Sequence, residues 1–171
     1  MVERITVEQV RAWLDPSVVG EITETSESTT EFNLELEVSR MPLHVIKEER
    51  SGPVRIVGKC GFDTERVAAL LDDDRRQREL FSQLSPVLVT VPGFYTFMDE
   101  EGTRCEFSDL RTIQFEQRRY PDGLSRDRLM GDVIAIAKGM RHVQNVVAVV
   151  RETTGDGGGE ASGDNGEETA E

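Results

Sequence analysis

The chain has 171 residues, which is enough for one domain of ordinary size and too few for two. Its formal net charge is −13 at pH 7, and 37% of its residues are hydrophobic. Binding to nucleic acids or to anionic membranes needs clustered positive charge, which this balance disfavours. We therefore expect neither nucleic acid nor membrane as a partner.

Charge and apolar content are unevenly distributed along the chain. Residues 152–171 contain seven acidic side chains, no basic one and almost no large apolar one. Such a segment cannot bury enough surface to offset its conformational entropy. We predict a single α+β domain over residues 1–151 and a disordered, acidic, glycine-rich tail over residues 152–171.

Composition also bears on the compartment. The chain has no apolar N-terminal segment and no run of ~18 apolar residues, so we expect a cytoplasmic protein without a membrane span. Three lysines stand against seventeen arginines and many acids, which indicates a high-salt cytoplasm, as in a halophilic archaeon. The alternative is a genome rich in GC, which also favours arginine codons. Cys60 and Cys105 are interpreted as free thiols, with a disulfide between them left open.

The first helix has a clear start signal. Thr6 and Gln9 have the spacing of a capping box. We predict a helix from this cap to Asp15-Pro16, with Trp13 as a core anchor.

Strands follow this helix. Phe32, Leu34, Leu36 and Val38 alternate with polar residues, which predicts a strand with one buried face. We predict strands over residues 18–25, 32–38, 43–47 and 54–60. Their short connections favour an antiparallel meander.

The central part of the chain combines a helical pattern with further strands. Asp63 caps a helical pattern that the charged run 72–78 interrupts, which leaves one long helix or two short ones open. We predict that Pro86 ends this helical region. Four strands should follow, over residues 87–91, 94–98, 103–107 and 112–117.

The last segment has helical periodicity. Ser125 is a candidate N-cap, and apolar residues then recur at steps of four and three: Leu129, Val133, Ile136, Met140, Val143, Val147 and Val150. Because β-branched residues dominate 146–150, a strand there is the competing interpretation for Val143–Val150. Helices and strands in separate groups predict an α+β fold, with a twisted antiparallel sheet packed with N-terminal, central and C-terminal helices.

This order of elements resembles an uncharacterised domain family of archaea. The resemblance rests on the Thr6–Leu14 helix, the strand Phe32-Asn-Leu-Glu-Leu, its partner Leu43-His-Val-Ile-Lys and the helix start Leu124-Ser-Arg-Asp-Arg-Leu-Met. That family is similar in fold to bacterial type III secretion chaperones and to YbjN-like proteins. The resemblance implies a fold that is often dimeric and that binds extended or amphipathic protein segments, and it brings no catalytic residue.

We find no pattern that indicates catalysis. His44 and His142 lack the paired spacing of zinc ligands, and Ser125 lacks the glycines and the buried strand of a nucleophile elbow. No glycine-rich phosphate-binding pattern is present. We therefore predict no catalytic residue, no cofactor and no metal site.

Two sets of residues are candidates for binding. Apolar residues on much of the circumference of the last helix, together with aromatics on both faces of one strand, indicate an interface: Val143, Val146, Val147, Val150, Phe94 and Phe97. Completion of the core is the alternative. Arg118 and Arg119 are candidate anion contacts, with salt bridges to the acidic body as the alternative.

The function that these features favour is a non-enzymatic protein-interaction module. Its partner would be a segment of another protein or a second copy of the chain, as in a homodimer. The alternative is a small-molecule-binding regulatory subunit, or an enzyme whose site is assembled from scattered residues.

Overall fold

The structure is a computed structural model that describes residues 4–26 and 28–155. Its elements in chain order are α1 (Val7–Trp13), β1 (Val19–Glu24), β2 (Phe32–Val38), β3 (Met41–Lys47), β4 (Val54–Gly61), α2 (Thr64–Leu71), α3 (Asp74–Leu88), β5 (Phe94–Met98), η1 (Phe107–Asp109), β6 (Thr112–Arg119), η2 (Pro121–Gly123) and α4 (Arg126–Gly155).

The strands form one antiparallel sheet in the order β1-β2-β3-β4-β6-β5. The first four strands follow one another as the predicted meander. β6 lies between β4 and β5 in the sheet. The last two strands of the sheet therefore come from the part of the chain that follows α2 and α3. These features confirm the α+β class with an antiparallel sheet.

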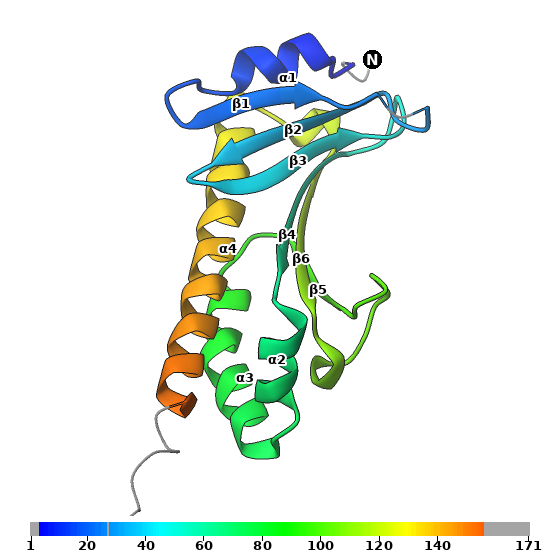
Figure 1. Cartoon of the computed structure of the whole chain (residues 1–171). Coiled ribbons are helices and arrows are strands. Elements are labelled where there is room, and N and C mark those ends of the chain that lie inside the picture. The colour runs from blue at the N-terminus through cyan, green and yellow to red at the C-terminus, as the bar shows by residue number, and fades with distance from the viewer. Residues whose placement is uncertain (1–3, 27, 156–171) are drawn as a thin grey trace, which may run out of the picture.

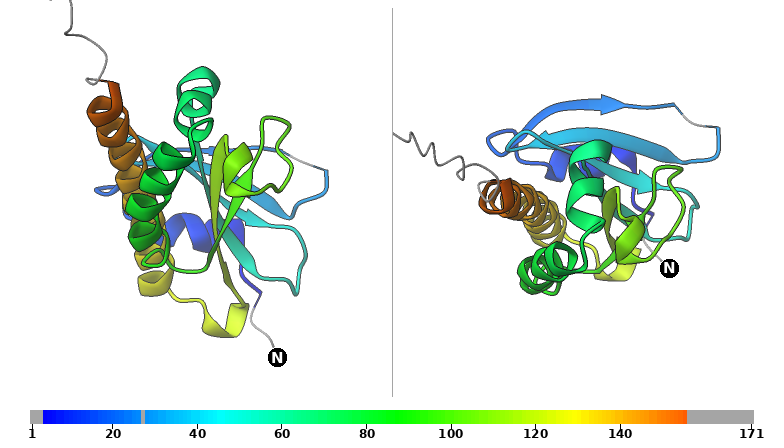
Figure 2. Two further views of the ribbon diagram at one scale, coloured as in Figure 1. Left: turned by 90° about the horizontal axis from the view of Figure 1, so that it is seen from below. Right: turned by 60° about the horizontal axis from the view of Figure 1, so that its bottom comes forward.

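Helices pack on one side and at one end of this sheet (Figure 1). α4 runs along the sheet and packs against β2, β3, β4 and β6. α3 lies beside α4, as Figure 2 shows from two further directions. The other face of the sheet carries no helix of the described chain (Figure 1). We call it the open face.

α4 contributes the predicted apolar stripe to the core. Leu129, Val133, Ile136, Met140, Val143 and Val150 are buried, and Val147 is partly buried against them. The helical interpretation of Val143–Val150 is therefore confirmed. Gly58 of β4 faces this stripe, and a Cβ added there would lie 2.5 Å from a methionine sulfur of α4. The helix thus approaches the sheet as closely as a glycine permits.

α4 is also long and apolar enough to meet the criteria of a membrane-spanning helix, although we expected no such segment. These criteria concern length and composition only, and core helices of globular domains also meet them; the apolar stripe of α4 is packed against the sheet.

The first helix begins as predicted. The Thr6 hydroxyl accepts a hydrogen bond from the Gln9 backbone N–H at 3.2 Å. Leu14 is the C-cap residue, just before Asp15-Pro16. Trp13 packs against the core but is only partly buried.

The central helical region consists of two helices. The Asp73 carboxylate accepts hydrogen bonds from two backbone amides at the start of α3, which separates α3 from α2. The prediction that Pro86 ends the helix was wrong, as was the predicted strand over 87–91, because α3 continues to Leu88. A proline in the last turn removes only one hydrogen bond near the helix end, and burial of Leu88 continues the stripe formed by Leu80 and Leu84.

The predicted strand over residues 103–107 was also wrong. The only pairing found for it among the described residues is one bridge between Met98 and Arg104, with the Cys105 N–H donating to the Phe97 carbonyl at 3.0 Å. This segment covers part of the outer edge of β5 and continues into η1. The other predicted strands lie within two residues of the observed bounds.

α4 continues to Gly155, four residues into the segment that we expected to be disordered. The rest of the predicted tail, residues 156–171, lies outside the described residues.

Candidate functional site on the open face of the sheet

The open face is built by every second residue of the strands. Because side chains alternate along a strand, residues paired across neighbouring strands form rows on one face. One row is Glu35, His44, Val57, Glu116 and Phe94, on β2, β3, β4, β6 and β5 in turn. A neighbouring row is Asn33, Ile46, Arg55 and Arg118.

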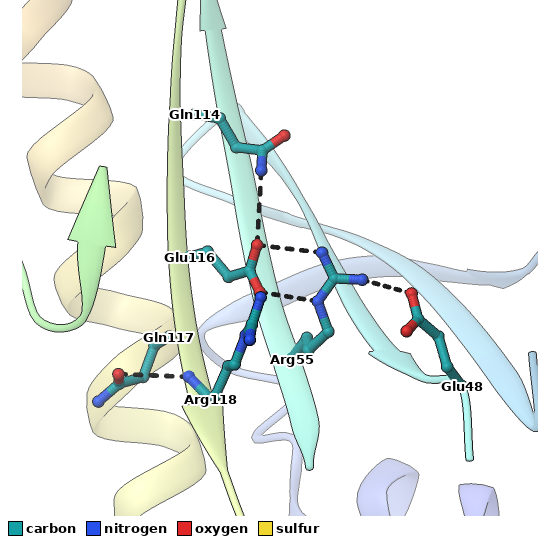
Figure 3. Close-up of polar contacts among 6 residues, drawn as sticks. All are labelled: Glu48, Arg55, Gln114, Glu116, Gln117 and Arg118. Carbon is teal, nitrogen blue, oxygen red and sulfur yellow. Dashed lines mark hydrogen bonds and ion pairs between the residues drawn. The ribbon is translucent and has the colours of Figure 1, made fainter. Parts of the chain in front are cut away.

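A charged network occupies the centre of this face (Figure 3). The carboxylate of Glu116, whose side chain is 3% exposed, accepts two hydrogen bonds from Arg55, at 2.8 Å from Nε and 3.0 Å from Nη2. The Nε of Arg118 donates to the same carboxylate at 2.6 Å. The remaining arm of Arg55 donates to Glu48. The network therefore joins β4 to β6 and to the β3–β4 connection.

The arginines keep Glu116 ionised. Burial alone would raise the pKa of this carboxyl, but the guanidiniums of Arg55 and Arg118 outweigh that effect and hold its pKa below its usual value. The same bonds raise the pKa of Arg55. A carboxylate that stays charged between two arginines has no proton to give or take near neutral pH. This network therefore holds the sheet together and presents fixed charges to the open face.

A hollow of about 350 Å³ adjoins the network on the same face. Val57 and Ile46 contribute apolar surface to it, and Asn33, His44 and Lys59 contribute polar groups. The His44 Nδ1 lies 3.1 Å from the Asn33 amide oxygen, which can only accept, so Nδ1 carries the proton of this bond. Lys59 is exposed and has no ion pair within the described residues.

The two candidate anion contacts point to opposite faces of β6. Arg118 lies on the open face, bonded to Glu116 and with its guanidinium 5.2 Å from the centre of the Phe94 ring. Arg119 points the other way and makes a bidentate bond to Asp132 of α4, at 2.7 and 2.9 Å. The salt bridges given as the alternative interpretation are therefore present, and the structure does not bring the two guanidiniums together.

The six candidate interface residues are also separated. Val143 and Val150 are buried in the core, which leaves them no surface for a partner. Val146 and Val147 are partly buried on α4. Phe94 is 45% exposed on the open face, whereas Phe97 lies on the helical side, 5.3 Å from the ring centre of Phe107.

The remaining histidines and cysteines of the described residues lie apart from the charged network. The described residues contain no group of three or more metal-binding side chains. Both cysteines are free thiols, and burial raises the pKa of Cys60 to about 11. His44 lies on the open face of β3, and His142 is exposed on α4, which packs on the opposite face of the sheet.

Sequence reasoning missed the network on the open face. Arg55 and Glu116 are 61 residues apart. The alternation of polar residues along β6 was a usable signal for a solvated face. The pairing of β4 with β6 had no comparable signal in the sequence, because two helices and another strand separate these strands along the chain.

Comparison with known proteins identifies a family whose function is uncharacterised. Residues 6–147 match the family described as "Uncharacterized conserved protein (DUF2299)". The chain belongs to this family. The predicted resemblance to an uncharacterised family is thus confirmed.

A solved structure supports the same architecture. The crystal structure of an uncharacterized protein from Methanothermobacter thermautotrophicus superposes with a TM-score of 0.65 at 16% sequence identity, over 87% of this chain and 99% of that one. At this identity the likeness shows the fold alone. None of the curated proteins compared with the chain matches it.

Proposed function

We propose that this member of the DUF2299 family is a non-catalytic binding module, which receives a segment of another polypeptide on the open face of its sheet. The observation that carries this proposal is the uncovered face itself, with its hollow, its fixed charges and its apolar residues. Solvated faces of antiparallel sheets are ordinarily polar. Here the partly exposed Ile46 and the exposed ring of Phe94 interrupt the polar pattern, and the buried Val57 lines the hollow.

The charged side chains at the centre of the face are bonded to one another before anything binds. Arg55 and Glu116 are locked together by two hydrogen bonds, and Arg118 is held by Glu116 and by the ring of Phe94. Groups that are already immobilised lose little conformational entropy when a partner binds. Apolar patches between fixed charges suit an extended segment that alternates apolar and polar side chains.

The chemistry of the described residues also favours binding over catalysis. The most buried carboxylate on the face is neutralised by arginines, so it is a poor general base. The resemblance to secretion chaperones, in which extended segments are bound, points in the same direction. We place the protein in the cytoplasm, in keeping with its free thiols and acidic composition.

Site-specific photo-crosslinking tests the proposal. Phe94 on the open face and Phe81 on α3 are phenylalanines of similar exposure, 45% and 42%. Each is replaced in turn by p-benzoylphenylalanine, which keeps an aromatic ring at the position. After irradiation in cell extract, we expect one discrete polypeptide to crosslink to position 94 and not to position 81, and mass spectrometry identifies the segment.

Two results count against the proposal. Crosslinking of the same polypeptides from both positions shows contact without a defined face. A discrete crosslink from position 81 alone places the binding surface on the helices.

A second candidate function is binding of a small anion in the hollow. It is favoured by Lys59, an exposed cation without an ion pair in the described part of a strongly acidic chain. Titration with citrate or inorganic phosphate, followed by NMR, separates the two functions. A small anion shifts the signals of Lys59 and His44 only, whereas a polypeptide also shifts those of Phe94 and its strand.

A further inference from the structure

Two hollows of the described surface flank the exposed ridge of α4, one on each side. Each has a volume of about 290 Å³. The first lies between α4 and the start of the sheet, among Val18, Val38, Ile134, Ala137, Lys138 and Arg141. The second lies between α4 and α3, beside Glu79 and Val149. Figures 1 and 2 agree that this side of α4 is uncovered.

The first hollow has the geometry of a packing hole. Residues 134, 137, 138 and 141 are spaced as i, i+3, i+4 and i+7, the four positions that surround an inserted side chain when two helices pack. The apolar side chains of Val18 and Val38 extend its wall. An apolar side chain from outside can therefore be buried there.

Val149 protrudes from the same helix, in contrast to the first hollow. It stands 57% exposed on the rim of the second hollow, and it is one of the few large apolar side chains so exposed on the described surface. Burial of an exposed valine in an apolar hole favours association. One helix face thus carries both a protruding apolar side chain and an apolar hole.

We propose that α4 pairs with α4 of a second copy of the chain, antiparallel, so that Val149 of each copy enters the hole of the other. The two-fold axis then passes between His142 and Asn145, because residues 149 and 138 lie at equal distances from that point. Helices in globular proteins cross most often at about −50°, and a crossing of this sense carries a side chain on one side of the ridge over a hole on the other. The contact is isologous, so it closes as a dimer.

Charges around the two features are complementary. Lys138 and Arg141 border the hole, whereas Glu79 lies beside Val149, with Glu152 one turn further along α4. Lys138, Glu79 and Glu152 have no ion pair within the described residues. Antiparallel pairing brings the basic rim of each copy to the acidic side of the other. Such complementarity selects a second copy over other acidic proteins.

This inference is independent of the proposed function, because the surface lies on the helical side of the molecule and not on the open face. It is tested by sedimentation equilibrium of the full chain at physiological and at high salt. We expect a monomer–dimer equilibrium for the natural sequence. Val149→Lys should weaken the dimer at least tenfold, since it places a cation in a hole bordered by cations.

Two further comparisons make the test specific. Val89→Lys is the matched control, because Val89 is 76% exposed at the end of α3, and it should leave the dimer unchanged. Lys138→Glu and Glu79→Lys should each weaken the dimer about tenfold, and the double variant should restore it to within about threefold of the natural sequence. Circular dichroism melting confirms that each variant folds.

A natural chain that is monomeric up to about 100 µM overturns the proposal, given the µM to nM constants of specific dimers. So does a Val149→Lys variant that dimerises as well as the Val89→Lys control. Failure of the double variant to recover contradicts the proposed register of the two helices.

Discussion

The network around Glu116 makes a stability prediction with a definite size. Arg55→Met keeps the aliphatic part of the side chain and removes two hydrogen bonds to a carboxylate that is 3% exposed. Removing one partner of a buried ion pair costs about 3–5 kcal/mol, and because Arg118 remains we expect about 3 kcal/mol. In a domain of this size about 1 kcal/mol lowers Tm by about 2–4 °C, so the expected decrease is about 6–12 °C.

A double-mutant cycle measured by urea unfolding tests whether these residues act as a unit. Arg55→Met and Glu116→Gln remove the same interaction, so the double variant should lose less stability than the sum of the singles, by about 1.5 kcal/mol or more. The exposed pair Arg11–Glu24, at 3.0 Å, is the control, and Arg11→Met should cost less than about 1 kcal/mol. Additivity within about 0.5 kcal/mol at the Glu116 pair would refute the reasoning.

The same network predicts a pH dependence. Because the pKa of Glu116 in the folded chain lies below its ordinary value of 4.5, the stabilisation is complete above 4.5 and is lost as the pH falls through the folded-state value. The natural chain should therefore lose more stability than Glu116→Gln between about pH 6 and about pH 3. Parallel stability curves for the two proteins would contradict a lowered pKa.

Three further predictions concern buried positions. Lys47 is fully buried and donates a hydrogen bond to a backbone carbonyl at 2.8 Å. In urea unfolding, the free energy of unfolding of Lys47→Met should lie within about 1 kcal/mol of that of the natural chain. That of Lys47→Ala should be lower by about 2 kcal/mol or more, since only alanine leaves a cavity. Equal losses would contradict this. Gly58→Ala should lower stability by about 1–3 kcal/mol, because the added Cβ would clash with α4. Gly131→Ala is the control: its Cβ would meet nothing within 4 Å, so it should raise stability by up to about 1 kcal/mol. Thermal melting distinguishes the two variants, and a tolerated Gly58→Ala would show a looser helix–sheet contact. Cys60, with a pKa of about 11, should react with iodoacetamide at least tenfold more slowly than the less buried Cys105, and similar rates by mass spectrometry would contradict its burial.

Much of the fold could be predicted from local patterns. β2 alternates strictly between apolar and polar residues, and the short turns to β3 and β4 leave an antiparallel meander as the simplest arrangement. α4 keeps one apolar stripe over many turns, which outweighed the β-branched residues near its end. In β2 and α4 the period of the apolar residues in the sequence matches the face that is buried in the structure.

The errors occurred where tertiary contacts override local preference. The apolar run 87–91 was interpreted as a strand, but Leu88 completes the buried face of α3, and Pro86 is tolerated in the last turn. Residues 103–107 have strand-like composition but lie along an edge and turn into η1. The steps of four from Leu80 through Leu84 to Leu88 were a local signal for the longer helix, whereas the edge position of residues 103–107 depends on the sheet.

The open face could be predicted only in part. Polar residues at every second position of β6 indicate a wet face, but which strand supplies their partners depends on the sheet order. Arg55 meets Glu116 because β6 inserts beside β4, and the hollow at Lys59 depends on the same pairing. Pairing between distant strands follows from packing of the whole domain and not from a local motif.

The central claim, that a polypeptide binds the open face, is tested most directly by the affinity of the crosslinked segment. The segment is synthesised and titrated calorimetrically into the natural chain, into Thr96→Arg on the open face, and into Ser82→Arg on the exposed side of α3. We predict that Thr96→Arg weakens binding at least tenfold, about 1.4 kcal/mol, and that Ser82→Arg leaves it unchanged. Equal affinity for the natural chain and Thr96→Arg, or a loss confined to Ser82→Arg, would contradict the account.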